Sequence, residues 1–261
     1  MYILEDVIKT LEEIAPPVLA EDWDNVGLMI GSRKQKVSKI MCALDINEEV
    51  ASEAVQNNVQ CIVTHHPLLF KPLHKIDFDS SKGSIIKKLI CQDISVYAMH
   101  TNYDIVRGGI NDILCQKLSI NNTEVLHISN LSRGSGIGRY GELSQATTLE
   151  DFIEKIKQVF KLSYVRVTDT TNRPVKRIAI CSGSGGDYIS RAAEVADVYI
   201  TGDIKFHEAQ EAKALGLSVI DIGHYASENI SISHIAFELN NRLKGINAMC
   251  SSVNGEVIHI K

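Results

Sequence analysis

The sequence predicts an α/β fold made of two duplicated strand–helix repeats. Short apolar runs rich in β-branched residues alternate along the chain with amphipathic segments of helical periodicity. This alternation is typical of α/β units with parallel strands. The pattern that begins at Lys39 returns at Arg177, which indicates an internal duplication. The chain has 261 residues, enough for one large domain or two closely associated ones with a full hydrophobic core.

The composition is typical of a globular cytoplasmic protein. Hydrophobic residues make up 44% of the chain and charged residues 23%. The net charge of −5 argues against nucleic acid as the main partner, because phosphate binding needs a basic face. No apolar run approaches 18 residues and no signal sequence is recognisable, so we expect no membrane association. The six cysteines are scattered without a CxxC pair, which favours a reduced protein without disulfides or a thiolate metal site.

The first repeat, residues 1–120, opens with an amphipathic helix over residues 3–15 that Pro16-Pro17 ends. An acidic turn follows around Trp23, the only tryptophan, which we expect to be packed within a capped loop. Asp24 and Asn25 could reach a site, although nothing in the pattern requires it. Strands and helices then alternate: strand Ile40–Leu44, helix Glu48–Gln56, strand Cys61–His65, a polar linker Pro67–Gly83, helix Ser84–Gln92, strand Ser95–His100 and helix Ile110–Leu118.

The connecting segment, residues 121–176, has a residue pattern that differs from that of the first repeat. The glycine-rich stretch Arg133–Leu143 favours a hairpin or a bulged edge strand. A phosphate cradle is the weaker alternative, because no clear strand-to-helix switch frames it. An amphipathic helix Leu149–Phe160 follows with Thr148 as its cap, and Tyr164–Thr168 alternates as a strand.

The second repeat, residues 177–261, echoes the first. Arg177–Cys181 resembles the strand at Lys39, and Ser218–Ile222 resembles the strand that ends at His100. Between them we expect helix Asp187–Val195, strand Asp197–Thr201 and helix Ile204–Leu215. Two similar α/β halves follow from this correspondence.

Histidines and carboxylates follow the predicted strands of both repeats. Ligands of parallel α/β sheets bind outside the carboxyl ends of the strands. His-x-x-x-Asp at His100 and His-x-x-x-Glu at His224 place an imidazole and a carboxylate on one helical face. One such pair is usually an exposed surface interaction, whereas two pairs at duplicated positions favour a metal site. The candidates are His65, His66, His100, Asp104, His224 and Glu228.

Mixed imidazole and carboxylate ligands suit Zn, Mn, Fe or Co and do not separate them. Five or six ligands are too many for one tetrahedral ion with an open position. They suit two ions that share a carboxylate and a water, an arrangement whose natural chemistry is hydrolysis.

Seven motifs in order along the chain resemble the Nif-three-like family, whose members are also filed as GTP cyclohydrolase I type 2 homologues. The resemblance extends from residue 5 to about residue 260. The motifs are Ala20–Leu28, Val63–Pro67, His100–Asp104, Gly138–Leu143, Gly183–Asp187, Tyr199–His207 and Gly223–Glu228.

The resemblance implies two intertwined α/β repeats in three layers with mixed sheets, and a dinuclear metal site between them. It also implies a ring-shaped homohexamer. The family's ligands fall on residues that all match in this chain, with Glu228 as the bridge: His65, His66, Asp104, His224 and Glu228. Longer relatives carry a domain inserted in mid-chain, for which this chain has no room.

The expected function is a metal-dependent hydrolase of a small, nucleotide-like substrate. The alternative is a non-catalytic, metal-bound ring that serves as a binding or regulatory scaffold. His100 lies outside the five ligands, either as a catalytic or orienting residue or as a packed one. His207 is a weaker candidate on a helix, and the other histidines are assigned to structure or surface.

Overall fold

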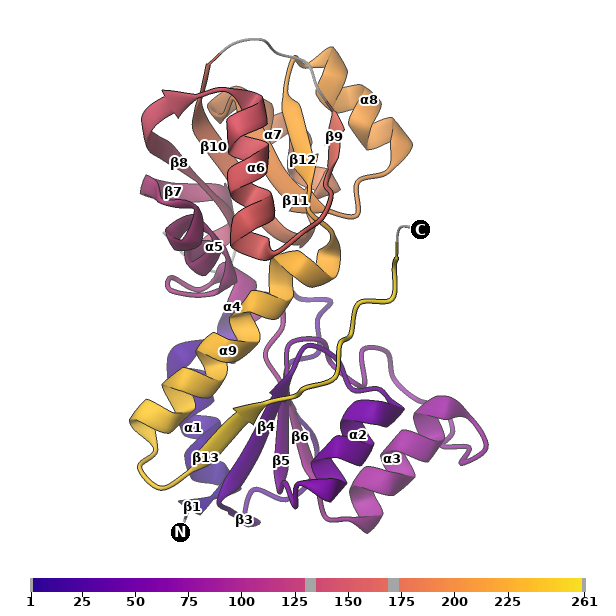
Figure 1. The fold of residues 1–261 in the computed structure, drawn as a ribbon. Coiled ribbons are helices and arrows are strands. Elements are labelled where there is room, and N and C mark those ends of the chain that lie inside the picture. The colour runs from indigo at the N-terminus through magenta and orange to yellow at the C-terminus, as the bar shows by residue number, and fades with distance from the viewer. Residues whose placement is uncertain (1, 130–134, 169–173, 260–261) are drawn as a thin grey trace. The chain divides into compact units, whose positions relative to one another are not determined.

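The computed structural model describes residues 2–129, 135–168 and 174–259. The chain forms two compact units: the first comprises residues 1–103 and 229–261, the second residues 104–228 (Figure 1). The chain therefore leaves the first unit once and returns to it. The predicted segments 1–120, 121–176 and 177–261 follow the sequence repeat, whereas the two units follow spatial contacts, and the C-terminal residues rejoin the first sheet.

The first unit is built on a mixed sheet of five strands within the described residues. Three neighbouring pairs are parallel, and only the edge strand β2 runs antiparallel to its neighbour β6. A short antiparallel pair, β1 (Tyr2–Ile3) and β3 (Lys36–Val37), lies outside this sheet. The strand order of the sheet is β13 (Asn247–Cys250), β4 (Lys39–Ala43), β5 (Cys61–Thr64), β6 (Ser95–Ala98) and β2 (Gly27–Ile30).

Helices cover both faces of this sheet, which gives the unit three layers (Figure 1). On one face, α2 (Glu48–Gln56) and α3 (Ser81–Cys91) bury a core that includes Met41, Ile62 and Val96 of the strands. Alternate strand residues point to the opposite face. On that face lie α1 (Leu4–Ile14) and the C-terminal part of α9 (His224–Arg242), a helix that begins in the second unit. A short η1 (Pro17–Leu19) follows α1.

The second unit contains a six-stranded mixed sheet among the residues described. Its central strands β10, β11 and β12 are parallel, and the outer pairs are antiparallel. The order is β7 (Ile120–Ile128), β8 (Gly136–Thr147), β10 (Val175–Ser184), β11 (Val198–Gly202), β12 (Ser218–Asp221) and β9 (Arg166–Thr168).

Helices α7 (Ile189–Val195) and α8 (Phe206–Ala214) bury one apolar cluster of this sheet with Ala179, Tyr199 and Val219. Two further helices, α5 (Ile110–Leu118) and α6 (Leu149–Phe160), add buried side chains such as Leu114 and Phe152. The short elements are η2 (Gly186–Tyr188) and α4 (Thr101–Ile105), which spans the first boundary between the units.

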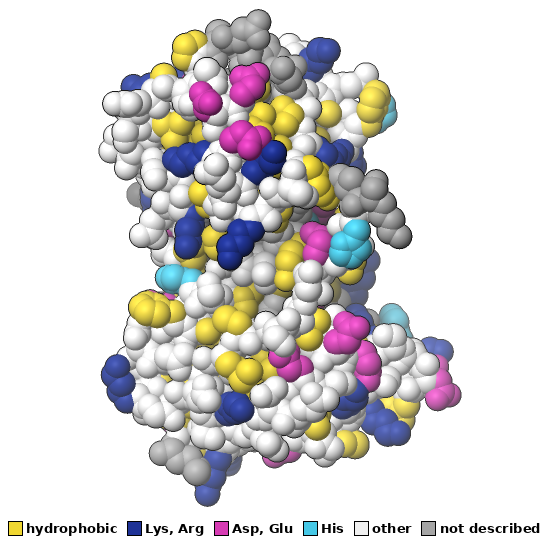
Figure 2. Space-filling model, viewed as in Figure 1, with side chains coloured by type: hydrophobic (Ala, Val, Ile, Leu, Met, Phe, Trp, Pro, Cys, Tyr) yellow, Lys and Arg dark blue, Asp and Glu magenta, His cyan; other side chains and the backbone are white. Residues whose placement is uncertain are grey.

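The predicted α/β class and mixed sheets are confirmed. The described part of the glycine-rich segment lies in β8, which pairs antiparallel with β7 in an irregular register and has Gly138 at φ +67°, so the hairpin prediction is confirmed from residue 135 onward. Arg133 and Gly134 lie outside the described residues. In the ranges that the structure covers, no helix is long and apolar enough to cross a membrane. On the face shown in Figure 2, acidic and basic side chains are interspersed over each unit.

Candidate metal centre

Three histidines gather at the carboxyl edge of the first unit's sheet. Because β5 and β6 are parallel neighbours, the residues that follow Thr64 and Ala98 emerge at the same edge. His65 and His66 follow β5 directly, and His100 follows β6. One ring nitrogen from each histidine lies within 4.8 Å of the others. We call these three residues the histidine cluster; His65 is fully buried and the other two are partly exposed.

The tautomers of the first two histidines follow from their partners. His65 Nδ1 lies 2.8 Å from the carbonyl oxygen of Met99, and His66 Nδ1 lies 2.9 Å from Asp45 Oδ1. Carbonyl and ionised carboxylate oxygens only accept hydrogen bonds, so each Nδ1 carries the proton. The lone pair of each ring is then on Nε2, the arrangement found in histidines that bind metals.

His100 is held by a buried carboxylate. Its Nδ1 donates to Asp24 Oδ1 over 2.7 Å, and Asp24 also accepts from the backbone N–H and the hydroxyl of Thr101 at 3.0 and 2.6 Å. The side chain of Asp24 is 0% exposed. Burial alone would raise the pKa of Asp24, but the hydrogen bonds from His100 and Thr101 outweigh it and lower the pKa from 3.8 to about 2. Asp24 is therefore ionised wherever the protein is folded near neutral pH.

His224 and Glu228 form the corresponding pair in the second unit. His224 begins α9, and Glu228 lies one turn later on the same face. His224 Nε2 is 3.0 Å from Glu228 Oε2, and its Nδ1 is 2.7 Å from Asp203 Oδ2. The hydrogen bond to Glu228 is the largest cause of a rise in the pKa of His224 from 6.5 to about 9; burial opposes the rise and Asp203 adds to it. Without a metal ion, this imidazole carries two protons at neutral pH.

Asp104 lies beside Glu228 in the same unit. An oxygen of Asp104 is within 4.8 Å of an oxygen of Glu228, and both side chains are almost completely buried. The hydroxyl of Ser182 donates to Asp104 Oδ1 over 2.9 Å. Asn111 donates to the Asp104 carbonyl over 3.0 Å and accepts from the Ser182 amide over 2.9 Å. Asp104 is thus tied to the end of β10.

A glycine makes room for Glu228. Gly183 has φ +64°, and a Cβ at this position would lie 2.3 Å from Glu228 Oε1. The Gly183 amide donates to the Ser227 hydroxyl over 2.9 Å, which fixes the loop against the first turn of α9. The turn Ser182–Gly186 is therefore adapted to a close approach by a carboxylate.

Arg139 fixes the backbone that follows Asp104, and sequence reasoning did not single it out. Its side chain is fully buried and binds Asp112 through Nε and Nη2, both at 2.9 Å. Nη2 also donates to the carbonyl oxygens of Ile105 and Val106 at 3.2 and 3.0 Å. Nη1 donates to two carbonyl oxygens of its own strand. All three nitrogens of the guanidinium donate hydrogen bonds, as a buried arginine requires.

The donors present fit a divalent transition-metal ion. They are imidazole nitrogens and carboxylate oxygens without a thiolate, the mixture that suits Zn, Fe, Mn or Co. Two ligand atoms of one ion lie about 3 Å apart, because each is about 2 Å from the ion. The 3.0 Å between His224 Nε2 and Glu228 Oε2 matches that separation. Each predicted histidine ligand has its Nδ1 held by a carbonyl or a carboxylate.

The structure brings together the predicted residues within each unit. His65 and His66 meet in the first, and in the second Glu228 meets both Asp104 and His224. The carboxylates that hold three of the histidines were missed: Asp45 and Asp203 were not considered, and Asp24 was only an open possibility. His207 is exposed on α8, where its Nδ1 lies 3.1 Å from Gln210 Oε1.

The prediction that Trp23 is packed was wrong. Its side chain is 60% exposed and contacts the rings of His100 and Phe70 only edge to face. The acidic turn is nevertheless well anchored, because Asp24 is buried beside Trp23.

The chain is similar to known proteins over nearly its whole length. Residues 2–256 match the family model Duf34/NIF3 (NGG1p interacting factor 3). A protein of Clostridium perfringens, named GTP cyclohydrolase 1 type 2 homolog, is 40% identical over 241 residues, which are 92% of each chain. A protein of the same name from Clostridium acetobutylicum is 37% identical over 94% of this chain and 92% of its own.

Among solved structures, a Bacillus cereus protein described as related to NIF3 is similar, with a TM-score of 0.92 and 26% identity. The similarity covers 100% of this chain and 99% of that one. The family model spans nearly the whole sequence and includes every residue of the candidate centre. The chain belongs to the Duf34/NIF3 family.

Proposed function

We propose that the chain binds two divalent metal ions and hydrolyses a small, nucleotide-like substrate. The ions are Zn, Fe, Mn or Co, and Glu228 bridges them. The ligands are His65, His66, Asp104, His224 and Glu228. The observation that carries the proposal is that every histidine of this set has its Nδ1 proton held by an acceptor, which leaves Nε2 as the ligand atom.

Chain connectivity places the proposed ligands of the second unit next to the residues where the chain passes from one unit to the other. Asp104 is bonded to Tyr103, the last residue of the first unit before the chain crosses, and Glu228 is bonded to Asn229, where it returns. Asp104 also lies four residues from His100 of the histidine cluster. The proposed ligands of the second unit are therefore close in sequence to both crossing points.

Two bound divalent ions supply Lewis acidity, which lowers the pKa of a bound water and stabilises negative charge on a substrate oxygen. His100 is the group of the chain that moves protons. Asp24 fixes its Nδ1–H, so Nε2 can accept the proton of the attacking water, and the adjacent carboxylate stabilises the resulting imidazolium. Nε2 then returns the proton to the leaving nitrogen or oxygen as the C–N or phosphate-ester bond breaks.

The substrate class rests on the relatives named GTP cyclohydrolase 1 type 2 homolog. The test is a turnover screen of nucleotides, phosphodiesters and cyclic amides with wild-type protein and His65→Ala. We expect turnover that falls at least 100-fold in His65→Ala and persists in His207→Ala, an exposed histidine outside the set. Tight binding of a screened compound without turnover would instead favour the non-catalytic binding scaffold.

Metal analysis tests the ligand set separately. Protein purified without chelator should contain up to two transition-metal ions per chain, and Glu228→Ala should lose most of them. Full metal content in Glu228→Ala would exclude the bridging role.

The chain also assembles, in this proposal, as a ring-shaped homohexamer in the cytoplasm. The cytoplasmic location is supported by the free thiols of its six cysteines. Light scattering should give a mass near six times the chain mass of 28.8 kDa. A stable mass near twice that value would contradict the ring.

A further inference from the structure

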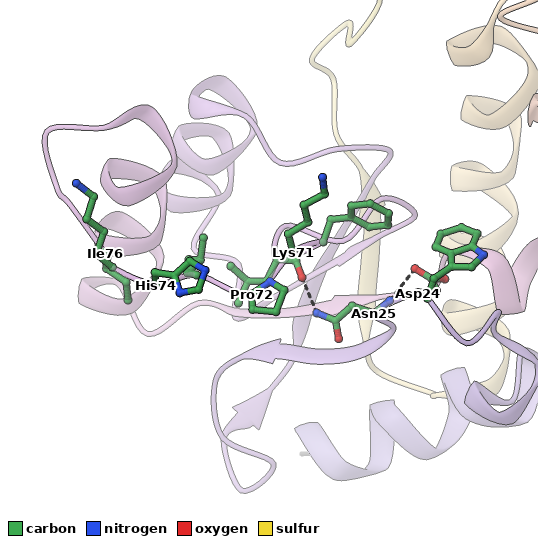
Figure 3. Close-up of a pocket in the computed structure, with 11 residues that line it drawn as sticks. Asp24, Asn25, Lys71, Pro72, His74 and Ile76 are labelled. Atoms are coloured by element: carbon green, nitrogen blue, oxygen red, sulfur yellow. Dashed lines mark hydrogen bonds between the residues drawn. The ribbon is translucent and has the colours of Figure 1, made fainter.

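A groove adjoins the histidine cluster through Asp24, which lines the groove and holds His100. It lies wholly within the first unit and has a volume of about 910 Å³. Two segments line it, Trp23–Asn25 and Leu69–Ile76, and Figure 3 shows Asn25 between Asp24 and the side of the groove formed by Lys71 and Pro72. We call it the aromatic groove. Its volume is in the range of small-molecule sites.

Two large aromatic side chains of the groove face solvent. Trp23 is 60% exposed and Phe70 41% exposed, although aromatic side chains ordinarily stabilise a fold most when they are buried. Their ring centroids are 6.0 Å apart at an interplanar angle of 71°. A third ring stacked between two others needs about 7 Å and parallel planes, so a flat ligand would stack on the outer face of Trp23 instead.

The position of Trp23 is fixed before any ligand arrives. The next residue, Asp24, is anchored by His100 and Thr101. The residue after that, Asn25, donates from Nδ2 to the Leu69 carbonyl oxygen over 2.5 Å, which joins the two segments that line the groove (Figure 3). A preorganised aromatic surface binds a flat ligand with little loss of conformational entropy.

The accessible charge of the groove is positive. Lys71 and Lys75 line it and are exposed. Its single acidic lining residue, Asp24, is buried and already accepts hydrogen bonds from His100 and Thr101. An exposed aromatic face in a groove that also carries exposed lysines suits a planar ring with an anionic group.

We propose that the aromatic groove binds the base and phosphate of a nucleotide, with the base on Trp23 and the phosphate toward Lys71. The centroid of the His100 ring is 6.1 Å from that of Trp23, so a stacked ligand lies one ring away from the histidine cluster. The groove is thereby the recognition site for the substrate of the proposed hydrolysis. That role rests on the proposed function, whereas nucleotide binding itself does not.

The fluorescence of Trp23 reports directly on binding at the groove, because Trp23 is the only tryptophan of the chain. Guanosine and adenosine monophosphate are titrated into the full-length protein, once metal-loaded and once after chelation, while tryptophan fluorescence is recorded. Both nucleotides should quench the fluorescence to saturation. The free nucleosides should bind at least 10-fold more weakly, and ribose 5-phosphate should cause little quenching.

Variants are compared by calorimetry, since Trp23→Ala has no tryptophan signal. Trp23→Ala should weaken nucleotide binding about 10-fold or more, and Trp23→Phe should restore part of the loss. Lys71→Ala should weaken nucleotide binding about 10-fold without changing nucleoside binding. Phe206→Ala removes an aromatic residue that is 71% exposed elsewhere and should bind like wild type.

Equal nucleotide affinity in wild type and Trp23→Ala, or the absence of saturable quenching, would overturn the proposal. A change in oligomeric mass in Trp23→Ala together with unchanged affinity would identify the groove as an interface between copies of the chain. Metal content distinguishes a failure of the groove proposal from a failure of the proposed function. Trp23→Ala should keep its metal ions, whereas His65→Ala should lose metal and turnover but retain the quenching.

Discussion

Asp24 Oδ1 accepts a hydrogen bond from His100 Nδ1 over 2.7 Å and so links a loop near the N-terminus to the end of a central strand 76 residues later. The same carboxylate holds Thr101, the first residue of α4, through two further hydrogen bonds. One buried side chain therefore orients the imidazole of the histidine cluster, anchors the turn that presents Trp23 and fixes the start of the short helix that contains Asp104.

The first prediction concerns the contribution of Asp24 to stability. Its folded-state pKa of about 2 is below the ordinary value of 3.8, so the carboxylate stabilises the fold above pH 4 and this contribution disappears as pH falls from about 4 to about 2. The shift corresponds to about 2 kcal/mol. In metal-free protein, urea unfolding should show Asp24→Asn less stable than wild type by about this amount at pH 7.

The difference between the two proteins should shrink steadily between pH 4 and pH 3. The exposed carboxylate of Asp79 provides the control, because Asp79→Asn should differ little from wild type at any of these pH values. A gap between wild type and Asp24→Asn that stays constant with pH would show that the ionised carboxylate is not the stabilising form.

The second prediction concerns the carboxylates that hold the proposed ligands. Asp45 fixes the Nδ1 proton of His66, and Asp203 that of His224. Replacement of either aspartate by asparagine should lower metal affinity about 10-fold to 100-fold, because the ring loses both its orientation and basicity at Nε2. Competition with a chromophoric chelator measures the affinity. Asp197→Asn is the matched control, since Asp197 binds Arg177 instead of a histidine.

Local sequence patterns predicted several helices well, although α4 and the long helix α9 were missed. The helices Glu48–Gln56, Ile110–Leu118 and Leu149–Phe160 have the predicted bounds because each combines an apolar face with a start or stop signal, such as the Thr148 cap that accepts from Asp151. Strands β2 and β13 were missed. The partner of β13 is β4, more than 200 residues earlier, and such pairing leaves no local signal.

The candidate site was only partly predictable for a related reason. Histidines at strand ends are rare enough to be noticed, whereas aspartates such as Asp45 and Asp203 are common in loops and gain meaning only from the imidazole that they contact. Trp23 was expected to be packed because tryptophan is usually buried in proteins. In the structure Trp23 is exposed while its neighbour Asp24 is buried, an arrangement that sequence periodicity does not reveal.

The third prediction tests the room that Gly183 leaves for Glu228. Alanine at position 183 would place Cβ 2.3 Å from Glu228 Oε1 and would also be strained at φ +64°. Gly216 has a similar φ of +71° with no atom within 4 Å of the Cβ position. Gly216→Ala should therefore cost about 1–2 kcal/mol from backbone strain alone.

Gly183→Ala should cost more than Gly216→Ala in urea unfolding and should also reduce metal content, which Gly216→Ala should preserve. Equal stability losses and equal metal content in the two variants would show that the Glu228 carboxylate can move aside without consequence.

The last prediction concerns Arg139. Lysine at this position keeps the charge but offers a single nitrogen in place of a fork that binds Asp112 and four backbone carbonyl oxygens. The buried carbonyl groups and carboxylate would lose partners, so Arg139→Lys should lower the free energy of unfolding by about 3 kcal/mol or more. Arg242→Lys, which alters a partly exposed ion pair with Glu238, should change it by less than about 0.5 kcal/mol. Because Ile105 directly follows Asp104, Arg139→Lys should also bind metal more weakly under conditions where it remains folded. Wild-type metal affinity in folded Arg139→Lys would confine the role of Arg139 to stability.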